Sequence, residues 1–582
     1  MKRKPWKIAL IMLSLSLLIV VSCDDDDNNN AGNAIFLRVT GDAQVSAARG
    51  SDVTFSLSIG SQAGITSLTA NGDNVNFTSG TTNEEVNYTF TVPGDAADGD
   101  EFDFEFVATD ANSQTTEAEA TVVVIRAMIT LENKSITPSF LSRQTGFEDV
   151  QIFSLFSSED DFPGSPDYVF GGSADGAGLR FDETTNEYVY IVNNEDNWAV
   201  SRIYLDETLT PLRGEYVMNS AGAGTRQCSA TLATPEEHGF GPIFLTAGES
   251  GDESLTKAIP LFDPITNAGV LDFYSKPALG RWTAENAVPL PLDAYGDQTL
   301  VVMADDDSGP EGGQIALYMS DVIGDLENGS LYALRRTNEN SDERDMVVGE
   351  VYDIEFVEIE NANTNTGLQN NMIAQSKNAM EFGRVEDVDY RKGGGAASRE
   401  VWFNVTGQNN SGNNADFTRT RKGRVYRMTL DENNPLEGTL EVIFDGDDAN
   451  GPANMFQNPD NILVTDNYVY IQEDPNRYGD ETHDAYLYQY NIATGALEVV
   501  FEIDQRSETI VPAYASASDA LGSWEYGAMI DVSDIVGMDD TFLLCIQSHT
   551  WRDDAFAGVD GGGQRDSEDE GSAVFVIKGL PR

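Results

Sequence analysis

The sequence predicts an all-β protein in which a small antiparallel sandwich is followed by a β-propeller. From about Ala34 to Arg126, apolar and polar residues alternate with period two, as in strands with one buried face. From about Ile129 to Arg582, short apolar runs are bounded by Gly, Asp, Asn or Pro, and no run has the length of a parallel sheet with helical crossovers. At 582 residues the chain is long enough for two or three domains with large cores.

The first residues have the pattern of a secretory signal. Four basic residues lie within the first seven positions and precede an apolar run, residues 8–21, that is too short to span a membrane. The run ends in Val-Val-Ser-Cys, which resembles a bacterial lipoprotein signal. That resemblance implies that residues 1–22 are a signal peptide and that Cys23 is lipidated and becomes the first mature residue.

Residues 23–33 are predicted to form an acidic tether. Four Asp and three Asn directly follow Cys23, and such a stretch is too polar and self-repelling to pack. An acidic stretch just after the lipidated Cys also resembles the surface-export signal of Bacteroidetes-type lipoproteins. The resemblance implies a protein that is anchored in the outer membrane through its lipid and exposed on the cell surface.

The charge of the chain excludes some classes of partner. The formal net charge is −62, from 97 acidic and 35 basic residues, so binding to nucleic acid or to an anionic membrane through a basic face is not expected. Three cysteines do not make a disulfide framework, although Cys228 and Cys545 are a candidate pair in an oxidising compartment. Cys545 lies in the apolar run TFLLCIQ and is predicted to be a buried small hydrophobe.

Residues 34–126 show the cleanest strand pattern of the chain. Alternating apolar residues occur over 53–59, 88–92 and 102–106, and a last run, TVVVIRA, closes the segment. Turn sequences such as NGD and PGDAADGD separate these runs, which is typical of an antiparallel sandwich of about 90 residues. The segment resembles the immunoglobulin-like modules of surface lipoproteins. It contains no catalytic constellation, and we expect a spacer or docking role.

Residues 129–582 contain more short strands than one ordinary sandwich can hold. Two stretches, RVYRMTL followed by GTLEVIFDG and AYLYQYN followed by GALEVVFEI, read as copies of one template of strand, turn and strand. Such self-similarity is typical of a β-propeller, whose blades direct loops and strand starts toward a central channel. The sequence does not show the number of blades.

Acidic or thiol-bearing residues occur at or just after many of these strand-like runs. Carboxylates delivered from several strand ends to one centre can hold hard cations, because calcium takes six to eight oxygen ligands from several directions. A multi-metal centre is therefore the leading hypothesis, and the alternative is that 97 acidic residues decorate any set of turns. The candidate ligands are Glu195, Cys228, Glu249, Glu285, Asp305, Asp306, Glu386, Glu473 and Glu525.

A family resemblance supports the same hypothesis. In order along the chain, from about Phe170 to His549, the motifs are NNE, RQCSA, GES, GRWTAEN, ADD, NGSLY, FGRVED, NPDN, VYIQED, WEYG and IQSH. As an ordered set they resemble the PhoX-type alkaline phosphatase family and its wider group of calcium-dependent propellers. The resemblance implies an axial site with several calcium ions and a pair of irons, as Fe³⁺, that hydrolyses phosphate esters.

The resemblance also assigns roles to residues. It implies that Cys228 is an iron ligand and that Glu249, Glu285, Glu386 and Glu473 bind the calcium and iron cluster. The aspartates of ADD and NPDN, which are Asp305, Asp306 and Asp460, would support that cluster. The chain departs from the family where CSATLATPEEHGFGPIFLTAGES replaces a Thr-Pro-Trp-Gly-Thr-Trp stretch, and where Asn194 replaces a histidine. These departures indicate a divergent branch.

The proposed chemistry follows from the residue types. A phosphate ester repels nucleophiles by its own charge, and bridging cations neutralise that charge while they activate an attacking oxygen. A thiolate is a soft ligand and points to iron or zinc in a site otherwise built from carboxylates. Arg281 and Arg384 lie beside proposed ligands and are expected to hold phosphate oxygens; the alternative is an inter-blade salt bridge.

Two classes of function remain open from the sequence. The first is a cell-surface, metal-dependent phosphoesterase that takes a phosphate-ester substrate. The second is a catalytically silent calcium-binding propeller that binds a glycan, a peptide or a partner lipoprotein; a lactonase-like calcium propeller is a third option, but it would not use a thiol. The chain contains no GxSxG elbow, P-loop or dinucleotide fingerprint.

Overall fold

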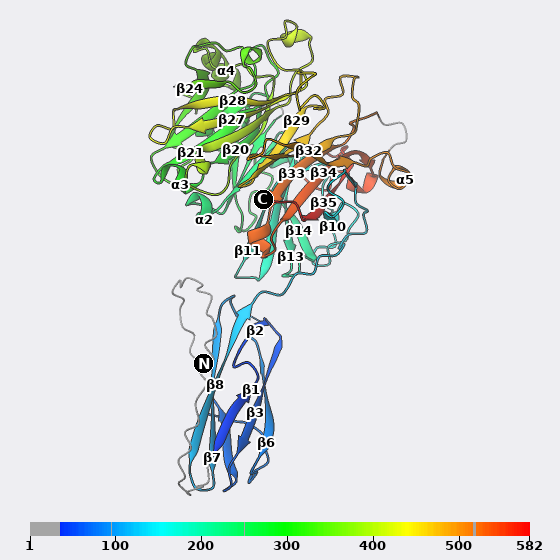
Figure 1. The fold of residues 1–582 in the computed structure, drawn as a ribbon. Helices are drawn as coiled ribbons and strands as arrows, with labels where there is room; N and C mark the ends of the chain where they lie inside the picture. Colours follow the sequence, from blue (N-terminus) through cyan, green and yellow to red (C-terminus); the bar gives the residue numbers. More distant parts are fainter. Residues whose placement is uncertain (1–34, 95, 250, 516–519) are drawn as a thin grey trace. The chain divides into compact units, whose positions relative to one another are not determined.

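The computed structural model describes residues 35–94, 96–249, 251–515 and 520–582. The chain forms two compact units, Met1–Ile129 and Thr130–Arg582 (Figure 1). The predicted signal peptide, the lipidation site Cys23 and the tether 23–33 lie outside the described residues. Among the residues that are described, none of the helices is long and apolar enough to cross a membrane.

The first unit is built from two sheets around one core. One sheet has the order β1-β3-β6 and the other has the order β2-β8-β7-β4-β5. Their apolar side chains form a single cluster that includes Phe55, Phe104 and Phe106. The strands are β1 (Phe36–Thr40), β2 (Gln44–Ala48), β3 (Asp52–Gly60), β4 (Ile65–Ala70), β5 (Asp73–Asn74), β6 (Glu84–Thr91), β7 (Glu101–Asp110) and β8 (Thr115–Ile125). The unit is a β-sandwich, and its immunoglobulin-like character stays a prediction.

The second unit is a β-propeller, which confirms the predicted fold class. Its described strands form six blades around a closed ring of innermost strands, each packed beside the next, and β33 packs beside β11 to complete the ring. The innermost strands are β11 (Ala174–Asp182), β15 (Gln227–Ala233), β20 (Ala284–Pro289), β25 (Val385–Tyr390), β29 (Pro459–Val464) and β33 (Glu525–Asp531).

The outer strands of the first five blades pair in turn outward from the innermost strands. They are β12 (Glu187–Asn194), β13 (Ala199–Leu205) and β14 (Pro211–Met218); β16 (Ile243–Gly248) and β18 (Lys257–Pro260); β21 (Thr299–Asp305), β22 (Ile315–Ser320), β23 (Ser330–Arg336) and β24 (Val351–Glu358); β26 (Glu400–Val405), β27 (Arg424–Leu430) and β28 (Glu437–Asp445); and β30 (Tyr468–Glu473), β31 (Tyr486–Asn491), β32 (Leu497–Ile503) and β9 (Leu141–Arg143). A short pair is formed by β17 (Ser254–Leu255), which lies between β16 and β18 in sequence, and β19 (Arg281–Trp282), which precedes β20. Strand β24 also pairs with β28 and so joins two blades edge to edge.

The sixth blade closes the ring with strands from both ends of the unit. It has the order β10-β35-β34-β33, with β10 (Gln151–Ser157), β34 (Thr541–Arg552) and β35 (Glu570–Lys578). β10 precedes every other strand of this blade by more than 300 residues of sequence, yet it pairs antiparallel with β35. Figure 1 shows β10 beside the orange and red strands β33, β34 and β35.

The repeated sequence template corresponds to equivalent strands. RVYRMTL is β27 and the following run is β28, while YLYQYN is β31 and its partner run is β32. Both pairs are the third and fourth strands of consecutive blades, counted from the axis. Inner strands read as continuous apolar runs because both of their faces are covered; every residue of β21 is buried.

Described helices are short and lie in connections between strands. They are α1 (Ser220–Ala223), α2 (Pro235–His238), α3 (Leu292–Tyr295), α4 (Gly367–Ser376), α5 (Val511–Tyr514) and α6 (Ser533–Val536), with the 3₁₀ turns η1 (Pro277–Leu279), η2 (Glu343–Asp345), η3 (Ala397–Arg399), η4 (Gly412–Asn414) and η5 (Asp554–Phe556). The longest, α4, begins at a capping box in which Thr366 and Gln369 satisfy each other's backbone N–H groups.

A β-bulge near the start of every innermost strand is the feature that positions the site. In each case the register with the second strand slips by one residue, so that two residues oppose one. The slips lie between Ala174 and Ala177, Gln227 and Ala230, Ala284 and Ala287, Val385 and Val388, Pro459 and Ile462, and Tyr526 and Met529. Bulges re-aim side chains, and here they do so at the same level of all six blades.

Candidate metal centre

Five blades place an acid or a thiol at the first residue of the bulge. These residues are Asp175, Cys228, Glu285, Glu386 and Asp460. All five line one cavity of ≈ 260 Å³. Their common position follows from the blade template and not from their spacing in sequence, because the connections between blades differ in length.

The sixth blade departs from the template for a steric reason. Gly527 occupies the equivalent bulge position, and a Cβ there would lie 2.1 Å from the backbone oxygen of Ala174. No side chain fits at that distance, so β33 passes close to β11. The carboxylate of this blade comes instead from Glu525, two residues earlier, which also lines the cavity.

A second set of carboxylates comes from the ends of the second strands. Each of the second strands β12, β16, β21 and β30 ends at the residue that pairs with the one before the bulge. In that order, these last residues are Asn194, Gly248, Asp305 and Glu473. The residue that follows each of them points toward the centre. Glu195, Glu249 and Asp474 line the axial cavity, and Asp306 lines a neighbouring cavity.

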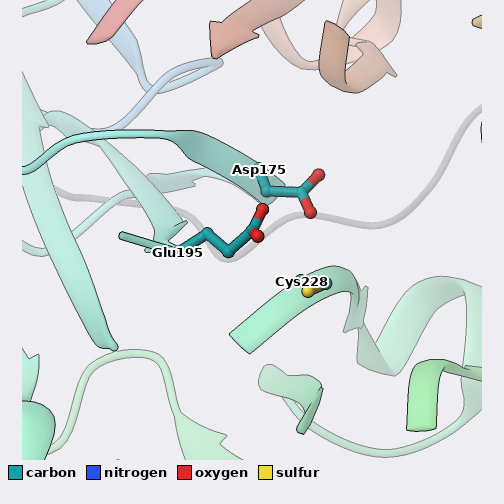
Figure 2. Close-up of side chains that lie close together, drawn as sticks. All are labelled: Asp175, Glu195 and Cys228. Atoms are coloured by element: carbon teal, nitrogen blue, oxygen red, sulfur yellow. The ribbon is translucent and has the colours of Figure 1, made fainter. Parts of the chain in front are cut away.

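Three groups of side chains bring ligand atoms within 4.8 Å of one another. The first is Asp175, Glu195 and Cys228; the second is Glu285, Glu386 and Asp460; the third is Asp460, Asp474 and Glu525. Figure 2 shows the first group, whose two carboxylates and thiol come from three separate chain segments. The second and third groups share Asp460, so the two would form adjoining sites.

The centre carries much more negative than positive charge. Ten carboxylates line the axial cavity together with Cys228, and the cations among the lining residues are three arginines with His549. Burial, followed by nearby carboxylates, raises the pKa of Asp175, Glu285, Asp460 and Glu525 well above the ordinary range. Burial and the neighbouring acids likewise raise the pKa of the Cys228 thiol. Such a cluster is stable only when protons or bound cations reduce its charge.

The residues present fit bound cations. The Oδ1 atom of Asp460 is buried and accepts no hydrogen bond from any described residue, although Asp460 belongs to two of the three groups. A buried carboxylate oxygen without a donor costs free energy unless an ion takes the donor's place. Two groups offer oxygen ligands alone, which suits calcium, whereas the group with Cys228 adds a sulfur, which suits a softer metal.

Arginines compensate part of the charge at the cavity wall. The Nε of Arg384 lies 2.7 Å from Asp306 Oδ1 and its Nη2 lies 3.1 Å from Glu386 Oε1. Arg226 lies 3.3 Å from Glu195 and 3.1 Å from Glu249, and its side chain is 43% exposed. Arg384 is therefore held between two blades, while Arg226 reaches the cavity from a more open position.

Some predicted site residues lie outside the axial cavity. Glu473 is fully buried in its blade, where it accepts hydrogen bonds from the backbone N–H groups of Gln457 and Tyr486 and from the Tyr488 hydroxyl. Asp305 accepts from the backbone of Thr283 and does not line the cavity. Strand alternation explains both placements, because the next residue, Asp474 or Asp306, is the one that points inward.

Arg281 also lies away from the centre. It donates to the backbone oxygen of Glu253 at 2.9 Å and pairs with the Glu253 carboxylate at 3.9 Å. It is absent from the lining of the axial cavity, whereas Arg384 lines it. Cys545 is buried beside the Tyr190 hydroxyl, 3.1 Å away, and also lies outside the cavity lining.

Sequence reasoning missed several lining residues. Asp175, Asp196, Arg226, Asp474, Arg565 and Glu570 line the axial cavity together with the predicted set, as does His549. His549 bridges two of these acids, with Nε2 at 3.0 Å from Glu525 and Nδ1 at 2.9 Å from Glu570. Asp175 and Asp474 could have been found from the blade template, since each takes the position that Glu285 and Glu195 take in other blades.

Comparison with known proteins adds little to this geometry. No protein-family model matches the sequence, and no curated protein matches it. Among solved structures, the chain is similar to the β-propeller domain of the Trilobed protease from Pyrococcus furiosus, with 9% identity, 94% of each chain covered and a TM-score of 0.24. It is also similar to an oligogalacturonate lyase in complex with manganese, with 10% identity, 92% of this chain and 99% of the other covered, and a TM-score of 0.22. Likeness at these scores says nothing of function, and the propeller assignment stands on the strand topology.

Proposed function

We propose that the propeller is a metal-dependent phosphoesterase of the PhoX-like kind. The observation that supports this most is the convergence of three ligand groups in one buried cavity, two built from oxygens and one that includes a thiol. A purely structural calcium site has no need of sulfur, because calcium prefers oxygen ligands. The mixed ligand set, with arginines at its wall, fits the binding of an anionic substrate at several cations.

The ligand groups divide the cations between them. Glu285, Glu386, Asp460, Asp474 and Glu525 would hold calcium, while Asp175, Glu195 and Cys228 would hold a metal that accepts a thiolate ligand, such as iron. When bound, such ions neutralise the charge of a phosphate ester and activate an attacking oxygen. The protein contributes the fixed positions of the ligands, which come from the ring of bulges.

Two arginines would bind and orient the phosphate. Arg226 and Arg384 both line the cavity, and guanidinium groups bind phosphate oxygens in bidentate fashion. Arg226 is the more accessible of the two, and its carboxylate partners Glu195 and Glu249 would turn to a metal once one is bound. Its guanidinium would then become available to the substrate.

The substitution Cys228→Ser tests the proposal. Calcium is held by oxygens and should remain, whereas the softer metal should be lost and with it phosphoesterase activity, by at least about 100-fold. Metal content and turnover of phosphomonoesters and diesters are measured side by side in the parent and the variant. Cys545→Ala is the matched control, since Cys545 is also buried but lies outside the cavity. Full activity with unchanged metal content in Cys228→Ser would contradict the proposal.

A silent calcium-binding propeller is the second candidate. It is favoured by the state of Arg384, whose guanidinium is already engaged by Asp306, Glu386 and Asn476. In that case the centre would only stabilise the ring, and the surface would bind a glycan, a peptide or a partner lipoprotein. Protein that is loaded with calcium and iron but hydrolyses no phosphate ester would establish this candidate.

We also propose that the protein is anchored in the outer membrane through Cys23 and exposed on the cell surface. The support is the sequence of residues 1–33, with its short apolar run, the Cys at its end and the acidic tether. Cys23→Ala should release the protein from the membrane fraction. Retention of that variant in the membrane, or protection of the parent from protease added to intact cells, would contradict the proposal.

A further inference from the structure

A second cavity adjoins the axial cavity. It has a volume of ≈ 690 Å³ and shares Glu249 and Arg384 with the axial cavity. Cavities that bind small molecules have volumes of about 300–1,000 Å³, so the second cavity can hold an organic molecule, whereas the axial cavity of ≈ 260 Å³ suits ions and a phosphate group. The organic part of a phosphate ester bound at the axis would lie in the second cavity.

We propose that the second cavity binds a hydroxyl-rich, uncharged leaving group, so that the substrates are sugar or polyol phosphates. This inference rests on the phosphoesterase function proposed above and names its substrate class. It is carried by three properties of the second cavity: the absence of aliphatic side chains from its described lining, an acidic wall, and a single aromatic ring that is held in place.

The first property is the composition of the lining. Six lining residues carry a neutral hydroxyl or amide group, and among the described lining residues there is no aliphatic side chain; the six are Thr283, Ser308, Gln408, Asn409, Ser411 and Asn413. Hydroxyl and amide groups both donate and accept hydrogen bonds, as sugar hydroxyls do. An aryl or alkyl leaving group would find few apolar partners there and would offer these polar groups no hydrogen bonds.

Some of these polar groups are fixed before any ligand binds. Gln408 donates from Nε2 to the backbone oxygen of Ser308 at 2.9 Å and accepts from Arg419 at 2.9 Å. Asn413 donates to the same Ser308 oxygen at 3.0 Å. Fixed polar groups lower the entropy cost of binding, which favours a specific ligand over general solvation of the cavity.

The second property is the acidic wall. Asp252, Asp306 and Asp307 line the cavity, and Asp307 is oriented by the backbone N–H of Gly309 at 2.8 Å and by Asn371 at 3.2 Å. Carboxylates accept hydrogen bonds from hydroxyl groups and repel a second anionic group. The wall therefore selects for a neutral polyol and against nucleoside diphosphates, nucleoside triphosphates and sugar bisphosphates.

The third property is the position of Tyr478. Its hydroxyl donates to the backbone oxygen of Gly407 at 3.1 Å, and the Arg421 guanidinium lies 4.9 Å from its ring centroid. Arg421 is itself held by two hydrogen bonds to Asp480, at 2.9 and 2.8 Å. The ring is thus a rigid aromatic element with a polar end, of the kind that packs against the C–H face of a sugar while its surroundings bind the hydroxyls.

Arg384 links the two cavities. It has a positive φ of 70°, which is uncommon outside glycine and is often found where a side chain is held for function. It lines both cavities, and its Nη1 donates to Asn476 at 2.7 Å. A phosphate at the axis and a sugar in the second cavity would meet at this residue, where the scissile bond of the ester would lie.

Turnover of paired substrates tests the inference. The full chain, loaded with metal, is assayed for kcat/KM on glucose 6-phosphate and on phenyl phosphate, and we expect the sugar ester to be preferred. Tyr478→Ala and Asn413→Ala should each lower the ratio of sugar to phenyl activity about tenfold, the effect of about 1.4 kcal/mol of lost binding. Asn433→Ala, in the exposed turn between β27 and β28, is the matched control and should leave the ratio unchanged.

A parent that prefers phenyl phosphate or a nucleoside monophosphate, or variants that leave the ratio unchanged, would overturn the inference. A second measurement separates it from the phosphoesterase proposal. Binding of methyl glucoside to the same proteins is followed by saturation-transfer NMR, which needs no turnover. If no ester is hydrolysed but Tyr478→Ala loses the sugar signal that Asn433→Ala keeps, the sugar site stands and the phosphoesterase fails. No sugar signal in the parent, or an equal signal in all variants, overturns the sugar site.

Discussion

The two units of this chain place their acidic residues in opposite ways. In strand β7 of the sandwich, Phe102, Phe104 and Phe106 are buried, and the acids between them, Asp103 and Glu105, are exposed. In the propeller, acids lie at the bulges of the innermost strands, where they are buried against one another. Solvated acids on a strand face cost little, whereas a buried cluster of like charges needs a compensating ligand.

The contrast shows which acids of a highly acidic chain mark a site. Total acidity does not do so, since both units are rich in acids. Acids that recur at one structural position of a repeat do mark a site, because folding of the repeat alone does not require a buried acid at the same bulge of successive blades. Changes of cation, of pH and of single residues test whether the two units differ in this way.

Removal of cations should have the largest effect and should be confined to the propeller. Three ions at concentrations of 100 times their Kd would add about 8 kcal/mol to the free energy of unfolding. Calorimetry of the full chain with calcium and with EDTA, at pH 8, should show the propeller transition falling by an amount on the order of 10 °C, with the sandwich transition unchanged. Equal shifts of both transitions, or no shift of either, would show that the two units do not differ in their need for cations.

The pH dependence of the cation-free propeller should be the second largest effect. Burial, followed by the nearby Glu570 carboxylate, raises the pKa of Asp196 to about 7. Burial and the Glu249 carboxylate raise the pKa of Asp306 to about 7, although the Arg384 guanidinium opposes this shift. Since these values lie above the unfolded value of about 3.9, the folded state binds more protons between pH 7 and 4, and stability rises as pH falls. For one isolated group of this kind, the free energy of unfolding should rise by up to about 2.7 kcal/mol from pH 7 to pH 5.

Thermal melts at pH 8 and pH 5 check this prediction. With cation-free protein the propeller should melt at a higher temperature at pH 5, whereas with saturating calcium the order should reverse, because protons and cations compete for the same carboxylates. A cation-free propeller that is less stable at pH 5 than at pH 8 would contradict the prediction.

Two adjacent acids at the end of β30 should differ in their effects. Glu473→Gln should cost about 2 kcal/mol of stability, since the buried carboxylate accepts bonds from two backbone N–H groups and a tyrosine. Asp474→Asn should instead lower the number of bound cations and raise the stability of the cation-free protein, because it removes one of the clustered negative charges. Metal analysis and denaturant melts of both variants distinguish the two roles; the reverse pattern would show that Glu473, and not Asp474, faces the cations.

The smallest effect is expected at Asp110 of the sandwich. Although burial opposes it, hydrogen bonds from the Gln114 backbone, the Ser61 hydroxyl and the Asn112 backbone lower the pKa of Asp110. Its stabilisation is therefore present above the unfolded pKa and is lost as pH falls through the folded pKa. Asp110→Asn should lower the melting temperature of the sandwich slightly at pH 7 and reduce its loss below pH 4. Any change in bound metal or in turnover would contradict this prediction.

The sequence predicts the fold better than it predicts the site. Apolar runs and turn residues were sufficient for an all-β chain, because burial of strand faces leaves a direct pattern. The choice between Glu473 and Asp474, and between Asp305 and Asp306, could not be made, since neighbouring residues at a strand end point to opposite sides and the sequence does not show which side faces the axis. Asp175 was missed because its segment, ADGAG, reads as a turn, although it is a strand that comes close to its neighbour.

Glycines in the inner strands explain part of that difficulty. A Cβ at Gly176 would lie 2.2 Å from the backbone nitrogen of Ala230, so glycine there permits β11 to approach β15. In a sequence such a glycine indicates the end of a strand, whereas in this ring it marks the closest contact. Glu570 could not be placed without knowing that β35 belongs to the blade that closes the ring.

The closing blade has a consequence for the order of events during synthesis. β10 emerges from the ribosome first among the strands of its blade and must wait for β35, more than 400 residues later, before it is paired. Glu525 arrives with those late strands, so the third ligand group, Asp460, Asp474 and Glu525, stays incomplete until then, whereas the other two groups come from earlier strands. The cavity that holds all three ligand groups is therefore closed only when the last blade has been synthesised and has paired with β10.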